Sequence, residues 1–418
     1  MSHPTVRGVV VVTRNGDRDD YNQDPYTYKS SHTDSTPLGE VQAHELGSLL
    51  RKEYFDQSSA NYIHNVRTDL VDLDQVHARI KSGGEGLFPP TPANTIELAN
   101  ETKVTAPLGG YQYVPAETVE PSNDRSLESW TDCPAFETHV KEFYDSAQFK
   151  DAAKTAEPFF KFANDFVFGR PLTLENVIYD FMNHQLTHNK TYAHRLPPTL
   201  IEQARHWANF HEQVPGRTLL QSIISSLERI TYDGDPLQFL VESTTYQPFI
   251  SLFAQTEMAK SDPTLQGIPN YASALAIELR RGSLPDNRDF LRFKFKNGTN
   301  DEFRTVHVFG HKADIPLTEF IYRVENAAIG SNSEWMKVCG ASSVSNPQPW
   351  SMPALPLLQG GGAKNSFATG MYGALFAALF MLAVLAVSKF FKRSRRGRIV
   401  LRTNGVSTSS RLYGPIVG

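Results

Sequence analysis

The pattern of apolar positions divides the first 340 residues into three parts. Residues 1–130 mix short apolar runs, glycine turns and helix-like stretches, beginning with four consecutive valines in VRGVVVVTR. β-Branched residues without polar alternation are typical of a strand that is buried on both faces. From about residue 136 to 230 the spacing is that of amphipathic helices. Strand-like runs return in LQFLVES, SALAIEL and FLRFKFKNGT, which ends in an Asn-Gly turn. This order predicts an α/β domain interrupted by a helical one.

The C-terminal part has a different pattern. The stretch FATGMYGALFAALFMLAVLAVS, residues 367–388, contains no charged residue and is long enough, as a helix, to cross a bilayer. The basic stretch KFFKRSRRGR follows at once, and Lys and Arg beside a span mark its cytoplasmic side. The residues before the span are rich in Ser, Pro and Gly, as linkers are. We therefore predict a single transmembrane helix.

These patterns predict six segments. They are a first part of the α/β domain (1–130), a mainly helical inserted domain (131–230), a second α/β part (231–340), a linker (341–366), a transmembrane helix (367–388) and a basic cytoplasmic tail (389–418). The orientation puts the large N-terminal domain in a lumen or outside the cell. However, the N-terminal segment MSHPTVRGVVVV contains no apolar stretch long enough for a signal peptide. Either the gene model lacks its first segment, which we favour, or the span is a tail anchor.

Net charge limits the classes of partner. The chain carries −4, and its last 30 residues contain eight Lys or Arg and no acid, so residues 1–388 carry −12. An acidic domain binds nucleic acid poorly, because neutralising phosphates requires clustered positive charge. The basic tail is suited to anionic lipid. We expect a membrane as partner and no nucleic acid; the sequence identifies no protein partner.

The cellular compartment determines whether the two cysteines can form a disulfide and whether the three sequons can be glycosylated. Cys133 and Cys339 either form one long-range disulfide in an oxidising compartment or are two separate buried thiols. Asn100, Asn189 and Asn297 each begin an Asn-X-Thr acceptor sequence for glycosylation, which has meaning only if the domain enters the secretory lumen.

The loop after the valine run carries candidate chemistry. It reads RNGDR, and it places Arg14 and Arg18 at the carboxyl end of a buried strand, where α/β proteins bind ligands. Two such arginines can hold a phosphate with paired hydrogen bonds, assisted by a helix N-terminus. The alternative is a structural ion pair with Asp17, Asp19 or Asp20, which are adjacent in sequence.

Several further segments resemble the histidine acid phosphatases, a branch of the histidine phosphatase (phosphoglycerate mutase-like) superfamily. The matching segments, in family order, are TPLGEVQAHELGSLLRKEYF (36–55), GLFPP (86–90), CPAF (133–136), IPNYASALAIELRRG (268–282) and DIPLTEFI (314–321). The resemblance covers roughly residues 5–340. It implies a three-layer phosphoglycerate mutase-like α/β sandwich with an inserted helical domain.

The resemblance also implies a reaction. In this family the histidine of an RHGxR loop attacks phosphorus, arginines hold the phosphoryl oxygens, and the aspartate of a later His-Asp pair protonates the leaving group. The chemistry needs no metal and no cofactor, and we expect none. The predicted phosphate-binding residues are Arg14, Arg18 and Thr244.

The catalytic positions of this chain depart from the family pattern. Asn15 stands where the nucleophilic histidine is expected, and Glu242-Ser243 stand in place of the His-Asp pair before Thr244-Thr245. An asparagine amide has no free nitrogen lone pair, so it cannot become phosphorylated. Glu242 could donate a proton if burial raised its pKa, although it lies one residue early.

A third phosphate-binding arginine is also in doubt. Arg79 is a weak candidate, and KSGGE leaves no room for the helix that normally precedes GLFPP. A segment missing from the gene model near residues 81–87 would explain the shortening.

Taken together, these features predict a single-pass membrane protein with a phosphatase-like ectodomain that is inactive or impaired and binds a phosphorylated small molecule. The alternatives are an active acid phosphatase or phytase-like enzyme, with Asp17 as nucleophile, and a structural cell-surface glycoprotein.

Overall fold

The computed structural model describes residues 5–340, except 20–22, 30, 32, 65–75, 80–83, 113–124, 126, 167–172, 175–178, 196, 209–215 and 284–286. The predicted linker, transmembrane helix and basic tail lie outside the described residues. None of the helices within the described ranges combines the length and the apolar character needed to cross a membrane.

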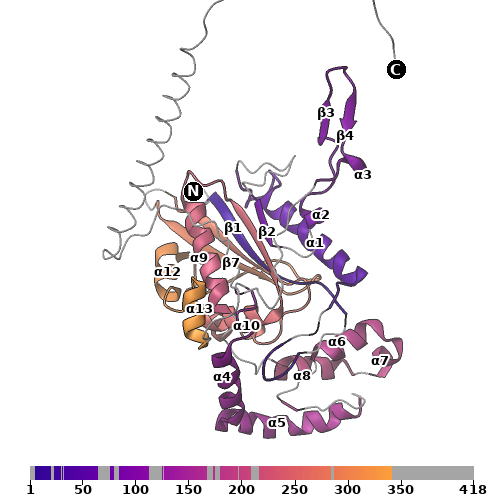
Figure 1. Ribbon diagram of the computed structural model, residues 1–418, viewed down its shortest axis with the longest axis vertical. Helices are drawn as coiled ribbons and strands as arrows, with labels where there is room; N and C mark the ends of the chain where they lie inside the picture. Colours follow the sequence, from indigo (N-terminus) through magenta and orange to yellow (C-terminus); the bar gives the residue numbers. More distant parts are fainter. Residues whose placement is uncertain are drawn as a thin grey trace, which may run out of the picture. The chain divides into compact units, whose positions relative to one another are not determined.

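A mixed β-sheet forms the centre of the described part of the chain (Figure 1). Its strands follow the order β2-β5-β1-β6-β7-β8, and β9 pairs with β7. They are β1 (Thr5–Arg14), β2 (Val76–Arg79), β5 (Phe239–Thr244), β6 (Ala274–Arg281), β7 (Asp289–Lys296), β8 (Arg304–Val306) and β9 (Ile315–Pro316). Strand β5 is parallel to β1 and β2, whereas β6 is antiparallel to β1. The carboxyl ends of β1 and β5 therefore meet at one edge, with Arg14 opposite Thr244.

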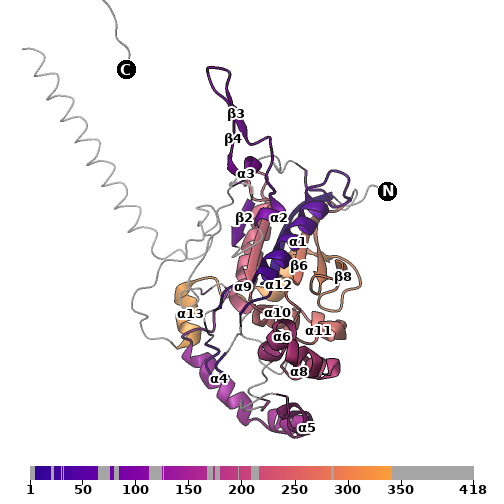
Figure 2. The same ribbon diagram turned by 90° about the vertical axis from the view of Figure 1, so that its right-hand side faces the viewer.

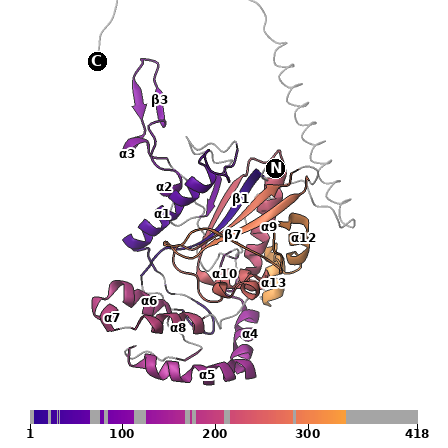
Figure 3. The same ribbon diagram turned by 180° about the vertical axis from the view of Figure 1, so that it is seen from behind.

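Helices pack on both faces of the sheet (Figures 1 and 3). Those beside it are α1 (Pro37–Tyr54), α2 (Gly84–Leu87), α9 (Arg217–Thr231), α10 (Tyr246–Gln255), α11 (Met258–Ser261) and α12 (Leu317–Val324). Val9 and Val11 belong to the core with Leu50 of α1, whereas Val10 and Val12 belong to the core with α9. Because side chains alternate along a strand, the valine run supplies both cores.

A second group of helices gathers beyond one end of the sheet around a separate core (Figures 1 and 2). They are α4 (Pro134–Asp145), α5 (Ala147–Asn164), α6 (Tyr179–His188), α7 (Lys190–Arg195) and α8 (Pro198–Ala208). Near the opposite end a hairpin of β3 (Thr95–Glu97) and β4 (Lys103–Thr105) projects from the body, followed by the single turn α3 (Pro107–Gly110). A 3₁₀ turn, η3 (Pro263–Leu265), precedes β6.

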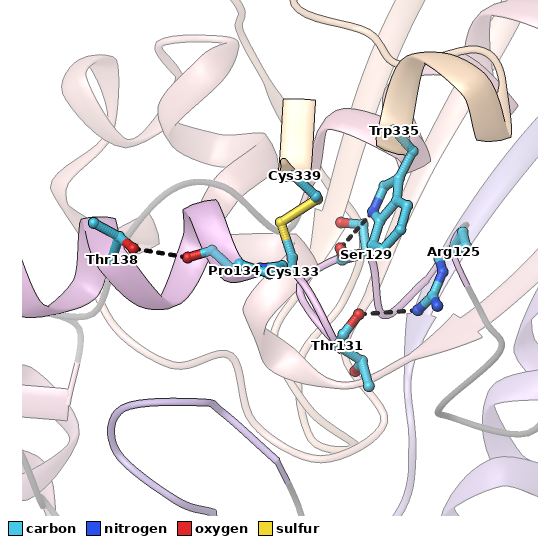
Figure 4. The surroundings of a disulfide bond; sticks show 8 residues. All are labelled: Arg125, Ser129, Thr131, Cys133, Pro134, Thr138, Trp335 and Cys339. Atoms are coloured by element: carbon cyan, nitrogen blue, oxygen red, sulfur yellow. Dashed lines mark hydrogen bonds between the residues drawn. A yellow bond between two sulfur atoms is a disulfide. The ribbon is translucent and has the colours of Figure 1, made fainter. Parts of the chain in front are cut away.

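A disulfide joins the start of α4 to the end of α13 (Asn332–Cys339), linking the two cysteines 206 residues apart in sequence (Figure 4). Trp335 lies beside it, where its indole nitrogen donates to the carbonyl of Ser129 at 2.7 Å. The Arg125 guanidinium lies 4.1 Å from a Trp335 ring centroid. This cluster attaches the first turn of α4 to the C-terminal end of the described chain.

The elements agree with the sequence pattern at most places. The strands predicted from LQFLVES, SALAIEL and FLRFKFKNGT are confirmed as β5, β6 and β7, and Gly298 of the Asn-Gly turn has a left-handed φ of 87°. Helix α9 falls inside the range predicted as the helical insertion but packs on the sheet. The exact domain boundaries stay a prediction. Among the described residues directly before the prolines of GLFPP, helix α2 is four residues long.

Candidate functional site

The RNGDR loop is held where β1 and β5 end. The backbone N–H of Asn15 donates to the carbonyl of Thr244 at 3.1 Å, and Asn15 accepts at its own carbonyl from Ala272 N–H at 3.1 Å. Further on, the N–H of Asp17 donates to Oε1 of Gln42 at 2.8 Å. The loop is therefore attached to β5, to the segment before β6 and to α1.

Two glycines allow the loop to lie against the first turn of α1. A Cβ at Gly16 would meet the carbonyl oxygen of Gly39 at 2.4 Å, and one at Gly39 would meet the carbonyl oxygen of Asp17 at 2.0 Å. Helix α1 begins after Thr36, whose Oγ1 accepts from Gly39 N–H at 3.2 Å. The same hydroxyl donates to the carboxylate of Asp17. Larger residues at either glycine would separate the loop from the helix.

The side chain of Arg14 is enclosed by described residues. The residue is 2% exposed, and its guanidinium lies 4.2 Å from the ring centroid of Tyr271 and 5.3 Å from that of Tyr246. Its Nη1 donates to the carbonyl of Pro269. Burial, reinforced by the nearby carboxylate of Asp180, raises the pKa of Tyr271 to about 12. Tyr271 therefore stays a neutral ring stacked against a buried cation.

An internal carboxylate lies between the two arginines of the loop. Asp180, on the first turn of α6, has its Oδ1 atom 3.2 Å from Nη2 of Arg14 and 4.0 Å from Nη2 of Arg18. All three side chains are at most 8% exposed. The arginines thus converge on one oxygen atom of the protein itself, which compensates buried positive charge.

Two more residues of α6 contact the same loop. His184 has Nδ1 3.2 Å from the carbonyl oxygen of Arg18, and His188 has Nε2 2.7 Å from Oδ2 of Asp17. Residues at positions i, i+4 and i+8 lie on one face of a helix. Asp180, His184 and His188 have this spacing, so one face of α6 covers the RNGDR loop.

The nucleophile and acid positions of the resemblance share a small cavity. Asn15, Gly16 and Ser243 line a space of about 30 Å³, together with Leu46 of α1 and Leu87 of α2. That volume accommodates a water molecule or two. The Nδ2 group of Asn15 donates to the carbonyl of Gly16 at 2.7 Å, and its Oδ1 has no hydrogen-bond partner among the described residues. Sequence-predicted positions 15 and 243 are thus brought together.

Glu242 and Thr244 have different surroundings. Glu242 is fully buried, and its carboxylate accepts from the Ser222 hydroxyl on α9. A proton-donating role for Glu242 does not fit this position, because the carboxyl belongs to the interface between α9 and the sheet and does not line the cavity at Asn15. Thr244 lies beside Arg14 in the sheet, and its buried Oγ1 lacks a hydrogen-bond partner in the described part of the chain.

The remaining candidates are placed in part. The backbone of Arg79 ends β2 beside Glu242, but its side chain lies outside what the structure describes. Asn100 and Asn189 are exposed. Asn297 is half-buried, and its Oδ1 accepts from Asn270 N–H at 2.9 Å. The described residues hold no cluster of His, Cys, Asp and Glu suited to a metal ion.

Sequence reasoning missed Asp180, the two histidines of α6 and the tyrosines around Arg14. The spacing of Asp180, His184 and His188 within a helix was a usable signal, because it predicts one polar face on an otherwise packed element. No local signal indicates that this face meets residues 14–18, more than 160 positions away.

Comparisons with known proteins are consistent with this geometry. No family model matches the chain. Bovine (Bos taurus) prostatic acid phosphatase is 24% identical over 366 residues, covering 80% of this chain and 87% of that protein. Among solved structures, a phytase from Citrobacter braakii aligns with a TM-score of 0.53 at 13% identity, covering 81% of this chain and all of that one. A phytase from Klebsiella sp. ASR1 aligns with 0.52 at 10% identity, covering 82% and 98%. The structural matches show the fold.

Proposed function

Since the chain is related to the histidine acid phosphatases in sequence and fold, we propose that its globular part is a phosphatase-like domain that binds a phosphorylated small molecule at Arg14 and Arg18 without hydrolysing it. The observation that carries this proposal is the pair of substitutions at the small cavity. By the family resemblance, Asn15 and Ser243 stand at the positions of nucleophile and acid, and both residues line the same space beside Arg14.

The chemistry of these side chains supports the loss of turnover. A phosphohistidine forms because an imidazole nitrogen offers a lone pair, whereas the nitrogen of an amide is a hydrogen-bond donor only. Moreover, Nδ2 of Asn15 is already bonded to the carbonyl of Gly16. A serine hydroxyl at position 243 is too weak an acid to protonate a leaving alkoxide at the pH where a carboxyl group would do so.

The RNGDR loop itself offers no well-placed substitute for the histidine. Asp17 is the only other nucleophile in the loop, but it is 1% exposed and its Oδ2 accepts from both Thr36 and His188. An active enzyme with Asp17 as nucleophile is therefore disfavoured. The arginines, by contrast, can hold an oxyanion without any of these groups.

The proposal is tested by turnover and by trapping. Purified protein should hydrolyse an aryl phosphate at acid pH with a kcat/KM below about 10³ M⁻¹s⁻¹, since ordinary enzymes exceed 10⁴. Acid quenching with labelled substrate should leave no label on the protein. A labelled phosphoprotein, or turnover in the range of ordinary enzymes, would overturn the proposal.

We also propose that residues 367–388 anchor this domain to a membrane, with the domain on the lumenal or extracellular side. The uncharged stretch and its basic flank support this. In a secreting cell, Asn100→Gln and Asn189→Gln should each raise gel mobility, because both acceptors are exposed. Asn297→Gln should not, because its side chain is half-buried and engaged. Glycosidase-insensitive mobility of the wild type would favour the cytosolic, tail-anchored alternative.

A further inference from the structure

Asp180 occupies the position that an oxyanion would take between the two arginines. Its Oδ1 atom lies 3.2 Å from Arg14 and 4.0 Å from Arg18, the point on which both guanidinium groups converge. A phosphoryl oxygen makes the same kind of contact with such a pair. The ligand and this carboxylate cannot both occupy that point.

The surroundings of Arg14 favour a replaceable partner. Pro269 and Asp180 take its two terminal nitrogens, yet its buried Nε donates to no partner among the described residues. The buried Oγ1 of Thr244, which is opposite Arg14 in the sheet, is also without a partner there. Unmet buried donors are costly, and an added acceptor with several oxygens would satisfy them.

From this geometry we infer that Asp180 is an internal competitor of the ligand, and that it determines how tightly the arginine pair binds a phosphate group. The inference rests on the proposed function, because it concerns the affinity of the same arginines. A phosphate enters when Asp180 leaves the arginines. Helix α6 then loses the contacts of Asp180 with the two arginines, while those of His184 and His188 lie one and two turns further along.

The test compares wild type with Asp180→Asn, which keeps the shape of the side chain and removes its charge. The probe is inorganic phosphate, titrated by calorimetry and by thermal unfolding, with acetate at equal ionic strength as a second arm. We expect Asp180→Asn to unfold at a lower temperature in chloride, to recover in phosphate, and to bind phosphate at least tenfold more tightly than wild type. Adding Arg14→Ala to Asp180→Asn should abolish both the recovery and the binding.

Matched variants separate this role from a merely structural one. Asp235 pairs with Arg229 at 2.8 Å, away from the loop, so Asp235→Asn should lose stability that phosphate does not restore. Asp180→Glu keeps the carboxylate and should not gain phosphate affinity. Recovery of Asp180→Asn in acetate equal to that in phosphate would overturn the inferred phosphate selectivity.

Several outcomes would overturn the inference, and they differ from a failure of the proposed function. Equal phosphate affinity in wild type and Asp180→Asn would overturn the inference alone, because binding at the arginines would stand. No phosphate binding by either protein would overturn both. If Asp180→Asn does not fold in chloride, folding on addition of phosphate supports the inference, and failure in both salts contradicts it.

Discussion

Two buried ionic clusters lie on the same sheet, and they are built differently. In one, Glu278 accepts from Tyr54 Oη at 3.0 Å, from Arg280 Nε at 2.8 Å and from Lys294 Nζ at 2.9 Å. In turn Lys294 binds Glu53 at 2.8 Å, and Arg280 donates to Asn61. In the other cluster, one oxygen of Asp180 faces Arg14 and Arg18. The buried Nε of Arg14 and Oγ1 of Thr244 have no hydrogen-bond partner among the described residues.

On our proposal, this difference separates a structural network from a ligand-binding site. In the first cluster two carboxylates balance two cations, and α1 is thereby attached to β6 and β7. A fully satisfied network rigidifies a core, whereas a partly satisfied one is costly unless something completes it. The second cluster lies at the carboxyl ends of β1 and β5, where a ligand can complete it.

The largest expected effect is at the satisfied cluster. Glu278→Ala leaves the buried cations Arg280 and Lys294 without their shared carboxylate, which typically costs about 3–5 kcal/mol of unfolding free energy. Urea unfolding of purified protein measures this loss. Phosphate should not restore it; restoration at concentrations that rescue Asp180→Asn would show that the two clusters do not differ as described.

The next effect concerns turnover at the cavity lined by Asn15 and Ser243. Restoring both missing groups, in Asn15→His with Ser243→Asp, should raise hydrolysis of an aryl phosphate at acid pH by about 10²-fold over Asn15→His alone, since a positioned general acid contributes roughly 10²–10⁴-fold. The control is Asn15→His with Ser243→Ala. Equal rates for all three variants would mean that positions 15 and 243 do not act on the same substrate.

The smallest effect is expected at Thr244. Thr244→Val replaces a buried hydroxyl that lacks a partner, so stability should stay within about 1 kcal/mol of wild type or rise, while phosphate affinity falls severalfold. The control is Thr256→Val: the Thr256 hydroxyl is buried and donates to the carbonyl of Leu252 at 2.6 Å, so its loss should destabilise by about 1 kcal/mol. The same loss of stability in both variants would indicate that Thr244 is satisfied.

Local patterns predicted much of the fold. The valine run, the three late strand-like stretches and the helix spacing correspond to β1, β5 to β7 and helices α4, α5, α8 and α9. These features depend on side-chain periodicity and turn residues, which are visible in sequence. Strand order and the packing of α9 on the sheet depend on contacts between distant segments, so the pattern alone did not determine them.

For the site, the sequence predicted individual residues but not their arrangement in space. Arg14 and Arg18 were singled out because they come at the end of a strand-like run, whereas Asn15 and Ser243 were singled out by the family resemblance. The structure brings Arg14, Asn15 and Ser243 to one cavity. The side-chain direction of Glu242 could not be predicted. Neighbouring residues of a strand point to opposite faces of the sheet, and only the packing of α9 shows which face the Glu242 carboxylate lies on. Asp180 was not predicted, because the sequence does not show which segment its helix packs against.

The most direct test of the central claim is a calorimetric titration of the wild-type protein with an aryl phosphate, followed by analysis of the recovered ligand. We predict saturable binding at one site that Arg14→Ala abolishes, with the ligand recovered intact and no burst of the released phenol. Release of one equivalent of phenol per protein molecule, or no binding at all, would contradict a phosphate-binding domain that has lost its nucleophile.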